Sequence, residues 1–200
     1  MNTSPWNKNR LIGQKRPLQI SHIWGIRIRL ELEGKTRDLA LFNMALDSKL
    51  RGCDLVKLKV SDVAYGSSVS SRATVLQQKT GSPVQFEITK GTRKSVAALI
   101  KLGNLHSKDF LFQSRAGINQ HISTRQYNRI FYGWVAKLGF EDSVYSTYSM
   151  RRTKPHLIYK KTKNLRVIQL LLGHKKLEST VRYLGIEVDD ALEISESIEV

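Results

Sequence analysis

The spacing of apolar residues predicts two helices near the start of the chain. Apolar positions recur at helical intervals through residues 22–33, with Ser21 as a candidate cap and Gly34 as a stop signal. Thr36 is a candidate cap for a second helix. A short helical turn is expected in DLVKL, residues 54–58. The apolar side of the second helix is supplied by Leu39, Phe42, Met44 and Leu46.

The pattern then changes from helical to extended. ATVLQ (73–77) and VQFEI (84–88) are short runs rich in β-forming residues, and the turn sequence QKTGSP joins them. We therefore expect a β-hairpin with a glycine-containing loop. The serine-rich stretch at 64–71 is predicted to be a loop.

Beyond the hairpin the pattern is mostly helical again. Thr89 is a candidate cap for a helix through residues 90–102, and FLF (110–112) is expected to be a buried extended piece. The fold class expected is α+β, mainly α-helical, with a small antiparallel β-sheet. The remaining predicted helices cover Thr124–Leu138, 148–160, Leu165–Leu172 and 176–184.

The charge of the chain indicates a class of partner, because 33 lysines and arginines outnumber 17 acidic residues. The net charge of +16 in a chain of 200 residues favours an anionic partner, most often nucleic acid. A single cysteine, Cys53, excludes an internal disulfide. No secretory signal and no apolar run of membrane-spanning length is found, so a cytoplasmic protein is expected, associated with the nucleoid if the cell is bacterial.

The charge is unevenly distributed, which suggests three parts. Residues 1–20 carry four basic and no acidic residues, and residues 151–166 carry seven basic and no acidic ones. Residues 186–200 carry six acidic residues and no basic one. We predict a basic N-terminal arm (1–20), a folded domain with a basic face (21–186) and an acidic C-terminal tail helix (187–200).

Five scattered residues together fit one kind of chemistry. They are Arg51, Lys79 in the hairpin turn, Arg151, His174 and Tyr183. Arginine forks bind phosphate oxygens and stabilise the charge of a phosphoryl-transfer transition state. A tyrosine hydroxyl can attack phosphorus and form a covalent intermediate, while a lysine can protonate the leaving oxygen. If these cations neutralise the charge, neither a metal nor another cofactor is required.

Four segments carry a resemblance to a known family. SKLRGCDLVKL, QQKTG, SMRRT and LLGHKKLESTVRYL resemble, in order, the sequence blocks of the tyrosine recombinase (phage integrase) family, over about residues 36–186. The most specific feature is LGH followed by a tyrosine nine residues after the histidine. The resemblance implies a site-specific DNA recombinase or integrase of a mobile element, which cuts and rejoins strands through a 3′-phosphotyrosyl link without metal or cofactor.

The resemblance also implies a role for each residue. Tyr183 would be the nucleophile, Arg51 and Arg151 would bind the scissile phosphate, Lys79 would be the general acid, and His174 would donate to a non-bridging oxygen. Each residue alone has a plainer interpretation: surface arginines, a solvated turn lysine, a histidine at a helix end, and a core tyrosine with a wet hydroxyl. Only their joint occurrence favours catalysis.

Two residues depart from the family pattern. The family usually has a histidine three residues before the second arginine, where this chain has Tyr148. Tyrosine has an ordinary pKa of about 10 against about 6.5 for histidine, so Tyr148 can hydrogen-bond but is a poor general base. Pro155 lies four residues after Arg151, so we expect either a helix that starts late or a displaced Arg151.

These observations predict several partners. Double-stranded DNA is the expected substrate, and a homo-oligomer is expected to bind it. An accessory protein is a further expected partner, because the roughly 35 residues before the resembling region are too few for the N-terminal domain of many family members. The acidic tail is expected to form an amphipathic helix that docks on a neighbouring protomer or on its own domain. The alternatives are a DNA-binding protein that keeps the fold without the reaction, and an RNA-binding protein.

Overall fold

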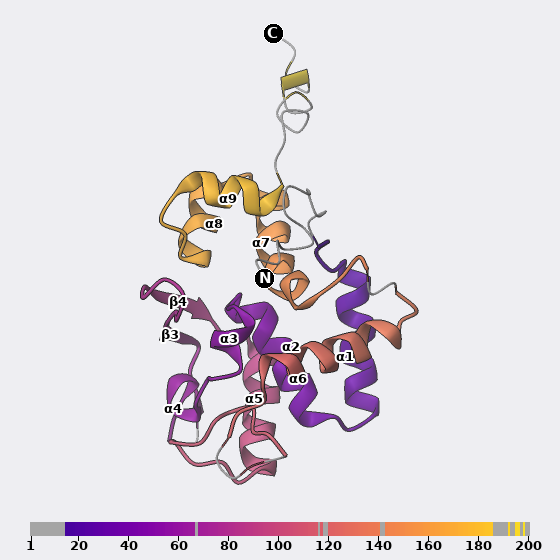
Figure 1. Cartoon of the computed structure of the whole chain (residues 1–200), viewed down its shortest axis with the longest axis vertical. Coiled ribbons are helices and arrows are strands. Elements are labelled where there is room, and N and C mark those ends of the chain that lie inside the picture. Colours follow the sequence, from indigo (N-terminus) through magenta and orange to yellow (C-terminus); the bar gives the residue numbers. More distant parts are fainter. Residues whose placement is uncertain are drawn as a thin grey trace, which may run out of the picture.

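The computed structural model describes residues 15–66, 68–115, 117, 120–140, 143–185, 192, 195–196 and 198. Helices dominate these residues, and two short antiparallel sheets accompany them (Figure 1). The fold class expected from the sequence is therefore confirmed. The helices are α1 (Ile20–Leu32), α2 (Thr36–Ser48), α3 (Gly52–Leu55), α4 (Val60–Val63), α5 (Lys90–Leu102), α6 (Thr124–Ala136), α7 (Thr147–Thr162), α8 (Leu165–Leu172) and α9 (Leu177–Leu184). The strands are β1 (Ala64–Tyr65), β2 (Ser68–Val69), β3 (Arg72–Leu76) and β4 (Pro83–Glu87).

Helix α2 lies in the core, where it packs against α1, α5 and α7. Every residue from Ala40 to Ser48 is buried, as expected for a helix covered on all sides. Its one buried amide is satisfied: Asn43 accepts a hydrogen bond from Arg27 Nε at 2.7 Å and donates to Ser95 Oγ at 3.2 Å. Helix α2 is followed by its C-cap residue Lys49, which adopts a left-handed conformation with φ of 55°. The chain then turns directly into Arg51.

The predicted hairpin is formed by β3 and β4, which pair antiparallel with Ala73 opposite Phe86 and Val75 opposite Val84. Ala73, Val84 and Phe86 are buried, so one face of the hairpin belongs to the core. The turn closes through hydrogen bonds from Gln77 N to Ser82 O and from Gly81 N to Gln77 O. Gly81 has a φ of +62°, which explains the glycine in this loop.

The serine-rich segment differs from its prediction. We expected a loop at residues 64–71, but the structure pairs Ala64 with Val69 and Tyr65 with Ser68 as a two-residue-per-strand hairpin, β1 and β2. Such short strands contain too few residues for a visible alternation of polar and apolar positions, which is why the sequence pattern did not reveal them.

Helix α7 also corrects an expectation. The helix does not start late: α7 begins at Thr147, capped by Ser146, and continues through Pro155 to Thr162. Proline removes the backbone bond to the Arg151 carbonyl but leaves the Arg151 side chain buried within the helix-packed region. The helix accommodates the proline because α7 is held by packing against α2, α6, α8 and α9.

The C-terminal helices α8 and α9 lie above the β3–β4 hairpin in the view of Figure 1, and α8 contacts β4. Gly173 ends α8 with a φ of +66°, and a Cβ there would collide with Val84 Cγ2 of the hairpin. Glycine is therefore required both by the turn and by the close approach of the hairpin. Within the described residues, no helix is long and apolar enough to cross a membrane.

Candidate active site

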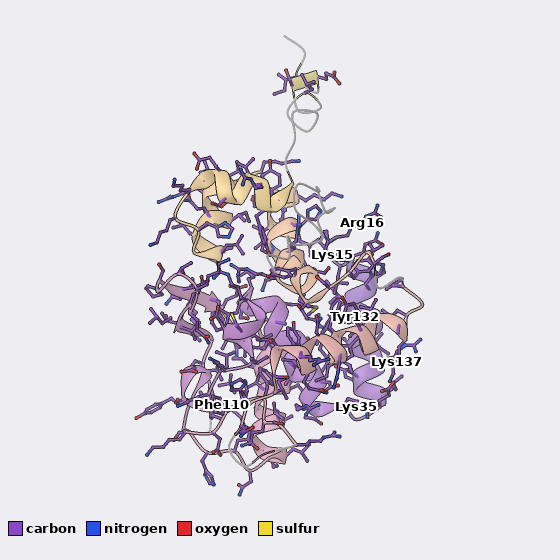
Figure 2. The ribbon with its side chains drawn as sticks, viewed as in Figure 1. Lys15, Arg16, Lys35, Phe110, Tyr132 and Lys137 are labelled. Atoms are coloured by element: carbon purple, nitrogen blue, oxygen red, sulfur yellow. The ribbon has the colours of Figure 1, made fainter. Side chains whose placement is uncertain are left out.

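Two adjoining pockets contain all six residues that the sequence nominated. One, of about 670 Å³, is lined by Tyr148, His174 and Tyr183 among others. The other, of about 710 Å³, is lined by Arg51, Lys79, Tyr148 and Arg151. Because Lys15 and Tyr148 line both, the two pockets form one groove, and Lys15 and Tyr132 mark its side near α6 and the start of the described chain (Figure 2).

Arg51 enters the groove from the start of α3. Its backbone is extended, with φ of −66° and ψ of 150°, because it is the N-cap residue between α2 and α3. Its Nη1 donates to Gln77 Oε1 at 2.6 Å, and the side chain is half-buried. The hairpin that carries Lys79 therefore also holds Arg51.

Arg151 enters the same groove from α7 and is only 4 % exposed. Its Nη2 donates to the Leu172 carbonyl at the end of α8, at 3.2 Å, whereas its buried Nε has no hydrogen-bond partner among the described residues. Burial lowers the pKa of the guanidinium, and the nearby positive Arg51 lowers it further, against the opposing effect of Tyr183. An anion in the groove would compensate this buried charge.

Tyr183, on α9, lies beside both arginines of α7. The guanidinium carbons of Arg151 and Arg152 are 5.9 Å and 5.3 Å from the centre of its ring. Its hydroxyl is buried without a well-aligned hydrogen bond to any described residue, although Arg151 is close enough to act on it electrostatically. Burial raises the pKa of Tyr183 to about 12, while Arg151, Arg152 and Arg51 oppose that rise. The phenol is therefore protonated at neutral pH.

His174 follows Gly173 and packs edge-on against Tyr183, with ring centres 5.4 Å apart. Its Nδ1 is 3.1 Å from Thr180 Oγ1, which fixes the ring and leaves Nε2 as the atom available to a ligand. Burial, together with the positive charges of Arg151 and Arg51, lowers the pKa of His174 to about 4. In the free protein at pH 7 the imidazole is therefore neutral and can donate through one nitrogen only.

An NMR titration of His174 should show this effect. In the free protein its ring signal should titrate near pH 4, and the pKa should rise when DNA or sulfate is added, because a bound anion offsets the charge of the two arginines. A His174→Gln variant assigns the signal. Titration at the ordinary value of about 6.5 in the free protein would contradict this description of the site.

Lys79 and Tyr148 lie at the open side of the groove. Lys79 is exposed in the hairpin turn and lines the pocket that contains Arg51 and Arg151. Tyr148 is the second residue of α7 and 65 % exposed. Because Tyr148 lines both pockets, it stands where the arginine side of the groove meets the side with His174 and Tyr183.

The sequence did not reveal the residues that support the site. Gln77 contacts Arg51 directly, and Asp54 accepts a hydrogen bond from Gln78 N at 3.0 Å, which ties α3 to the hairpin. Asp54 is buried, and its second oxygen has no partner among the described residues. The available signal was a carboxylate three residues after Arg51, but without the fold it resembles any surface residue.

A buried ion cluster lies next to these segments. Lys49 is completely buried and pairs with Glu87 of β4 at 2.9 Å. Lys154 of α7 bridges Glu87 at 2.5 Å and Asp47 of α2 at 2.6 Å. The cluster therefore joins the end of α2, which leads to Arg51, with the hairpin and with the helix of Arg151. Each residue is an ordinary charged residue in the sequence, and only the fold brings the four together.

Comparisons with known proteins agree with this geometry. The model of the phage integrase family matches residues 26–188. A probable integrase/recombinase, YoeC of Bacillus subtilis (strain 168), is 27 % identical over 158 residues, covering 79 % of this chain and 82 % of the relative.

Two solved structures share the fold. XerA recombinase superimposes with a TM-score of 0.72 at 19 % identity, covering 91 % of this chain and 63 % of that one. XerH site-specific recombinase, in a post-cleavage complex with a palindromic difH substrate, has a TM-score of 0.72 at 16 % identity, covering 98 % of this chain and 57 % of the other. The chain thus spans less than two thirds of the length of either solved recombinase. With its family match and its fold in agreement, the chain belongs to the phage integrase (tyrosine recombinase) family.

Proposed function

We propose that this protein is a DNA strand transferase that cleaves and rejoins duplex DNA through a covalent link between Tyr183 and a 3′-phosphate. The observation that carries the proposal is the position of the Tyr183 hydroxyl, buried beside Arg151 and His174 in a groove open to a ligand. A core tyrosine with a wet hydroxyl, the plainer interpretation, would have its oxygen at the solvent boundary, whereas Tyr183 lies buried beside the guanidinium groups of Arg151 and Arg152.

In the proposed reaction, the Tyr183 oxygen attacks the phosphorus and the bond from phosphorus to the 5′ oxygen breaks. Arg51 and Arg151 hold the non-bridging oxygens, and His174 donates a hydrogen bond to one of them. Lys79 gives a proton to the departing 5′ oxygen, and the phenolic proton leaves to a base. Rejoining is the reverse, with a 5′ hydroxyl attacking the phosphotyrosyl bond, so the bond energy is retained and no external energy source is consumed.

Charge around the groove supports DNA as the substrate. Basic side chains occur at both of its ends: Lys15, Arg152, Lys176 and Arg182 line one pocket, and Arg125 lines the other together with Lys79. Such a rim contacts phosphates and positions a duplex without reading its sequence. We further propose that the protein acts as a homo-oligomer, because a palindromic substrate such as the one bound by XerH offers two equivalent half-sites.

Tyr148→His should accelerate cleavage. Tyr148 stands at the junction of the two pockets, where a histidine could exchange a proton with Tyr183 near neutral pH. A general base is typically worth about 10²–10⁴-fold, so we expect single-turnover cleavage to speed up about a hundredfold. Tyr148→Phe is the matched control, because it removes the hydroxyl without adding a base. An unchanged rate in the histidine variant would show that Tyr148 does not limit the reaction.

Covalent trapping tests the proposed function. Wild type and Tyr183→Phe are incubated with nicked duplexes prepared from genomic DNA of the source organism, then denatured in SDS. DNA attached to wild type but absent from the Phe variant is the expected result. Salt-sensitive DNA binding without any adduct, even in Tyr148→His, would instead favour a DNA-binding protein that lacks the reaction.

A further inference from the structure

Gln77 occupies an unusual position for an uncharged side chain, directly between the two arginines of the groove. It follows the last residue of β3 and is only 1 % exposed. Its backbone closes the turn that carries Lys79, through bonds with Ser82 and Gly81. The backbone that carries this side chain is therefore fixed by the hairpin turn.

The amide of Gln77 uses both its oxygen and its nitrogen in hydrogen bonds with its surroundings. Its Oε1 accepts from Arg51 Nη1 at 2.6 Å and from Thr80 Oγ1 at 3.1 Å. Its Nε2 donates to the Leu172 carbonyl at 3.3 Å, and the same carbonyl accepts from Arg151 Nη2 at 3.2 Å. The amide orientation follows from these partners, because a flipped amide would place its NH₂ group against the guanidinium and its oxygen against a carbonyl.

We infer that Gln77 is a positioning residue that sets the separation and orientation of Arg51 and Arg151. The hydrogen bonds form one chain: Arg51 to Gln77, Gln77 to the Leu172 carbonyl, and that carbonyl to Arg151. The chain joins α3, the hairpin, α8 and α7 at one buried point. The catalytic part of this inference rests on the proposed function, since two arginines need to meet one phosphate in register.

The local packing supports a fixed arrangement rather than a chance contact. Gly173, which follows Leu172, lies so close to the hairpin that a Cβ would meet Gln77 Nε2 at 3.5 Å and collide with Val84. Because the two segments approach this closely, the Leu172 carbonyl is held within reach of the amide. Displacing Gln77 would therefore disturb the turn that leads into His174 as well as both arginines.

The chemistry of this position favours glutamine over its nearest relatives. Methionine has a similar shape but offers no bond to Arg51 and no donor to the Leu172 carbonyl. Glutamate would keep the acceptor for Arg51 but would lose the donor, and its charge would compete with a phosphate for the arginines. Asparagine is one methylene shorter and could not span both partners from the same backbone position.

The test compares Gln77→Met with Gln78→Met. Gln78 is the matched control because it is a glutamine on the same hairpin, but its side chain contacts Lys57 and the Cys53 carbonyl instead of the arginines. We expect Gln77→Met to slow single-turnover cleavage about 10–100-fold, with DNA affinity changed less than about twofold, since no phosphate-binding charge is removed. Gln78→Met should cleave at the wild-type rate.

A second measurement does not depend on activity. In ¹⁵N-arginine-labelled protein, the guanidinium signals of Arg51, assigned with Arg51→Lys, should show hindered rotation in wild type and in Gln78→Met. Gln77→Met should lose this hindrance. Gln77→Glu is the second variant, in case methionine prevents folding. It should keep the hindered rotation of Arg51 but still cleave DNA at least about tenfold more slowly than wild type. If wild type cleaves no DNA, the proposed function fails, and the arginine signals still decide whether Gln77 holds Arg51. The inference would be overturned if Gln77→Met cleaved DNA at the wild-type rate, or if its Arg51 signals were the same as in wild type.

Discussion

Replacing Arg151 with lysine is expected to slow DNA cleavage about a thousandfold while leaving the protein folded. Arg151 is buried in α7 and already donates one hydrogen bond, to Leu172, which orients the rest of its planar fork toward the groove. Lysine keeps the charge but cannot donate two parallel bonds to phosphate oxygens. Loss of one fixed donor to a transition-state oxyanion typically costs 10²–10³ in rate, and the contribution of an arginine in phosphoryl transfer reaches about 10³–10⁵.

Arg152→Lys is the matched control for this prediction. Arg152 is the next residue of α7 and its guanidinium also lies against the Tyr183 ring, whereas the hydrogen bond to the Leu172 carbonyl comes from Arg151. We expect Arg152→Lys to change the cleavage rate less than about tenfold, measured as the single-turnover rate of adduct formation on saturating DNA. A larger loss in Arg152→Lys than in Arg151→Lys would reverse the roles that we assign to the two residues.

Glu87→Ala is expected to destabilise the fold by about 3 kcal/mol. Glu87 neutralises Lys49, whose side chain is completely buried, and removing one partner of a buried pair leaves an uncompensated charge that typically costs about 3–5 kcal/mol. The lower end of that range applies because the Glu87 side chain is 36 % exposed. Thermal unfolding should show a Tm lower by about 6–12 °C for a chain of this size.

Removing Lys49 as well as Glu87 distinguishes the effect of an unpaired buried charge from a simple loss of packing. Lys49 has a φ of 55°, a conformation that glycine adopts without strain, so Lys49→Gly removes the buried charge at little backbone cost. The double variant Lys49→Gly/Glu87→Ala should therefore unfold at a higher temperature than Glu87→Ala alone. If the losses of stability in the two single variants simply add in the double variant, the unpaired charge of Lys49 is not the cause of the destabilisation in Glu87→Ala.

The same cluster gives the fold an acid sensitivity. Burial opposes ionisation of Asp47 and Glu87, but hydrogen bonds from Lys154, with Lys49 also acting on Glu87, outweigh it and lower the pKa of both carboxyls. Carboxyls whose folded pKa is lowered stabilise the fold above their unfolded pKa of about 4, and this contribution is lost as the pH falls through the folded value. Stability should therefore decline below about pH 4, and the decline should be smaller in the double variant.

Much of the fold could be predicted from the sequence because its signals are local. Gly34 lies at the boundary between α1 and α2, and the glycine of QKTGSP marks the hairpin turn. The predicted caps Ser21 and Thr36 are wrong, because the N-cap residues are Gln19 and Lys35. The helix over Leu165–Leu172 is confirmed at both ends, where Asn164 caps it and Gly173 ends it. Helix α4 was missed because four residues contain little more than one turn of periodicity.

The supporting part of the site could not be predicted in the same way. Gln77 and Leu172 are 95 positions apart, and Asp47 and Lys154 are 107 apart, so no local pattern relates them. Pro155 was overinterpreted for a similar reason: the local rule predicts disruption of a helix, while tertiary packing maintains α7 through the proline. The six nominated residues came from order and spacing that resemble a family, and their roles remain proposals.

Two predicted parts of the chain fall mostly outside the described residues. Of the basic arm at 1–20, the structure describes residues 15–20, where Lys15 lines the groove and bonds to the Ser143 carbonyl. Of the acidic tail at 187–200, it describes only residues 192, 195–196 and 198. The tail helix and its docking on a neighbouring protomer therefore stay predictions.

The most direct test of the central claim is to identify the residue that carries the DNA. The SDS-stable adduct is digested with nuclease and protease, and the peptide bearing the residual nucleotide is sequenced by mass spectrometry. This identification is informative because two tyrosines, Tyr148 and Tyr183, line the same pocket. We predict a phosphodiester on Tyr183, in the peptide from α9. A nucleotide on Tyr148, or an adduct that persists in Tyr183→Phe, would contradict the account.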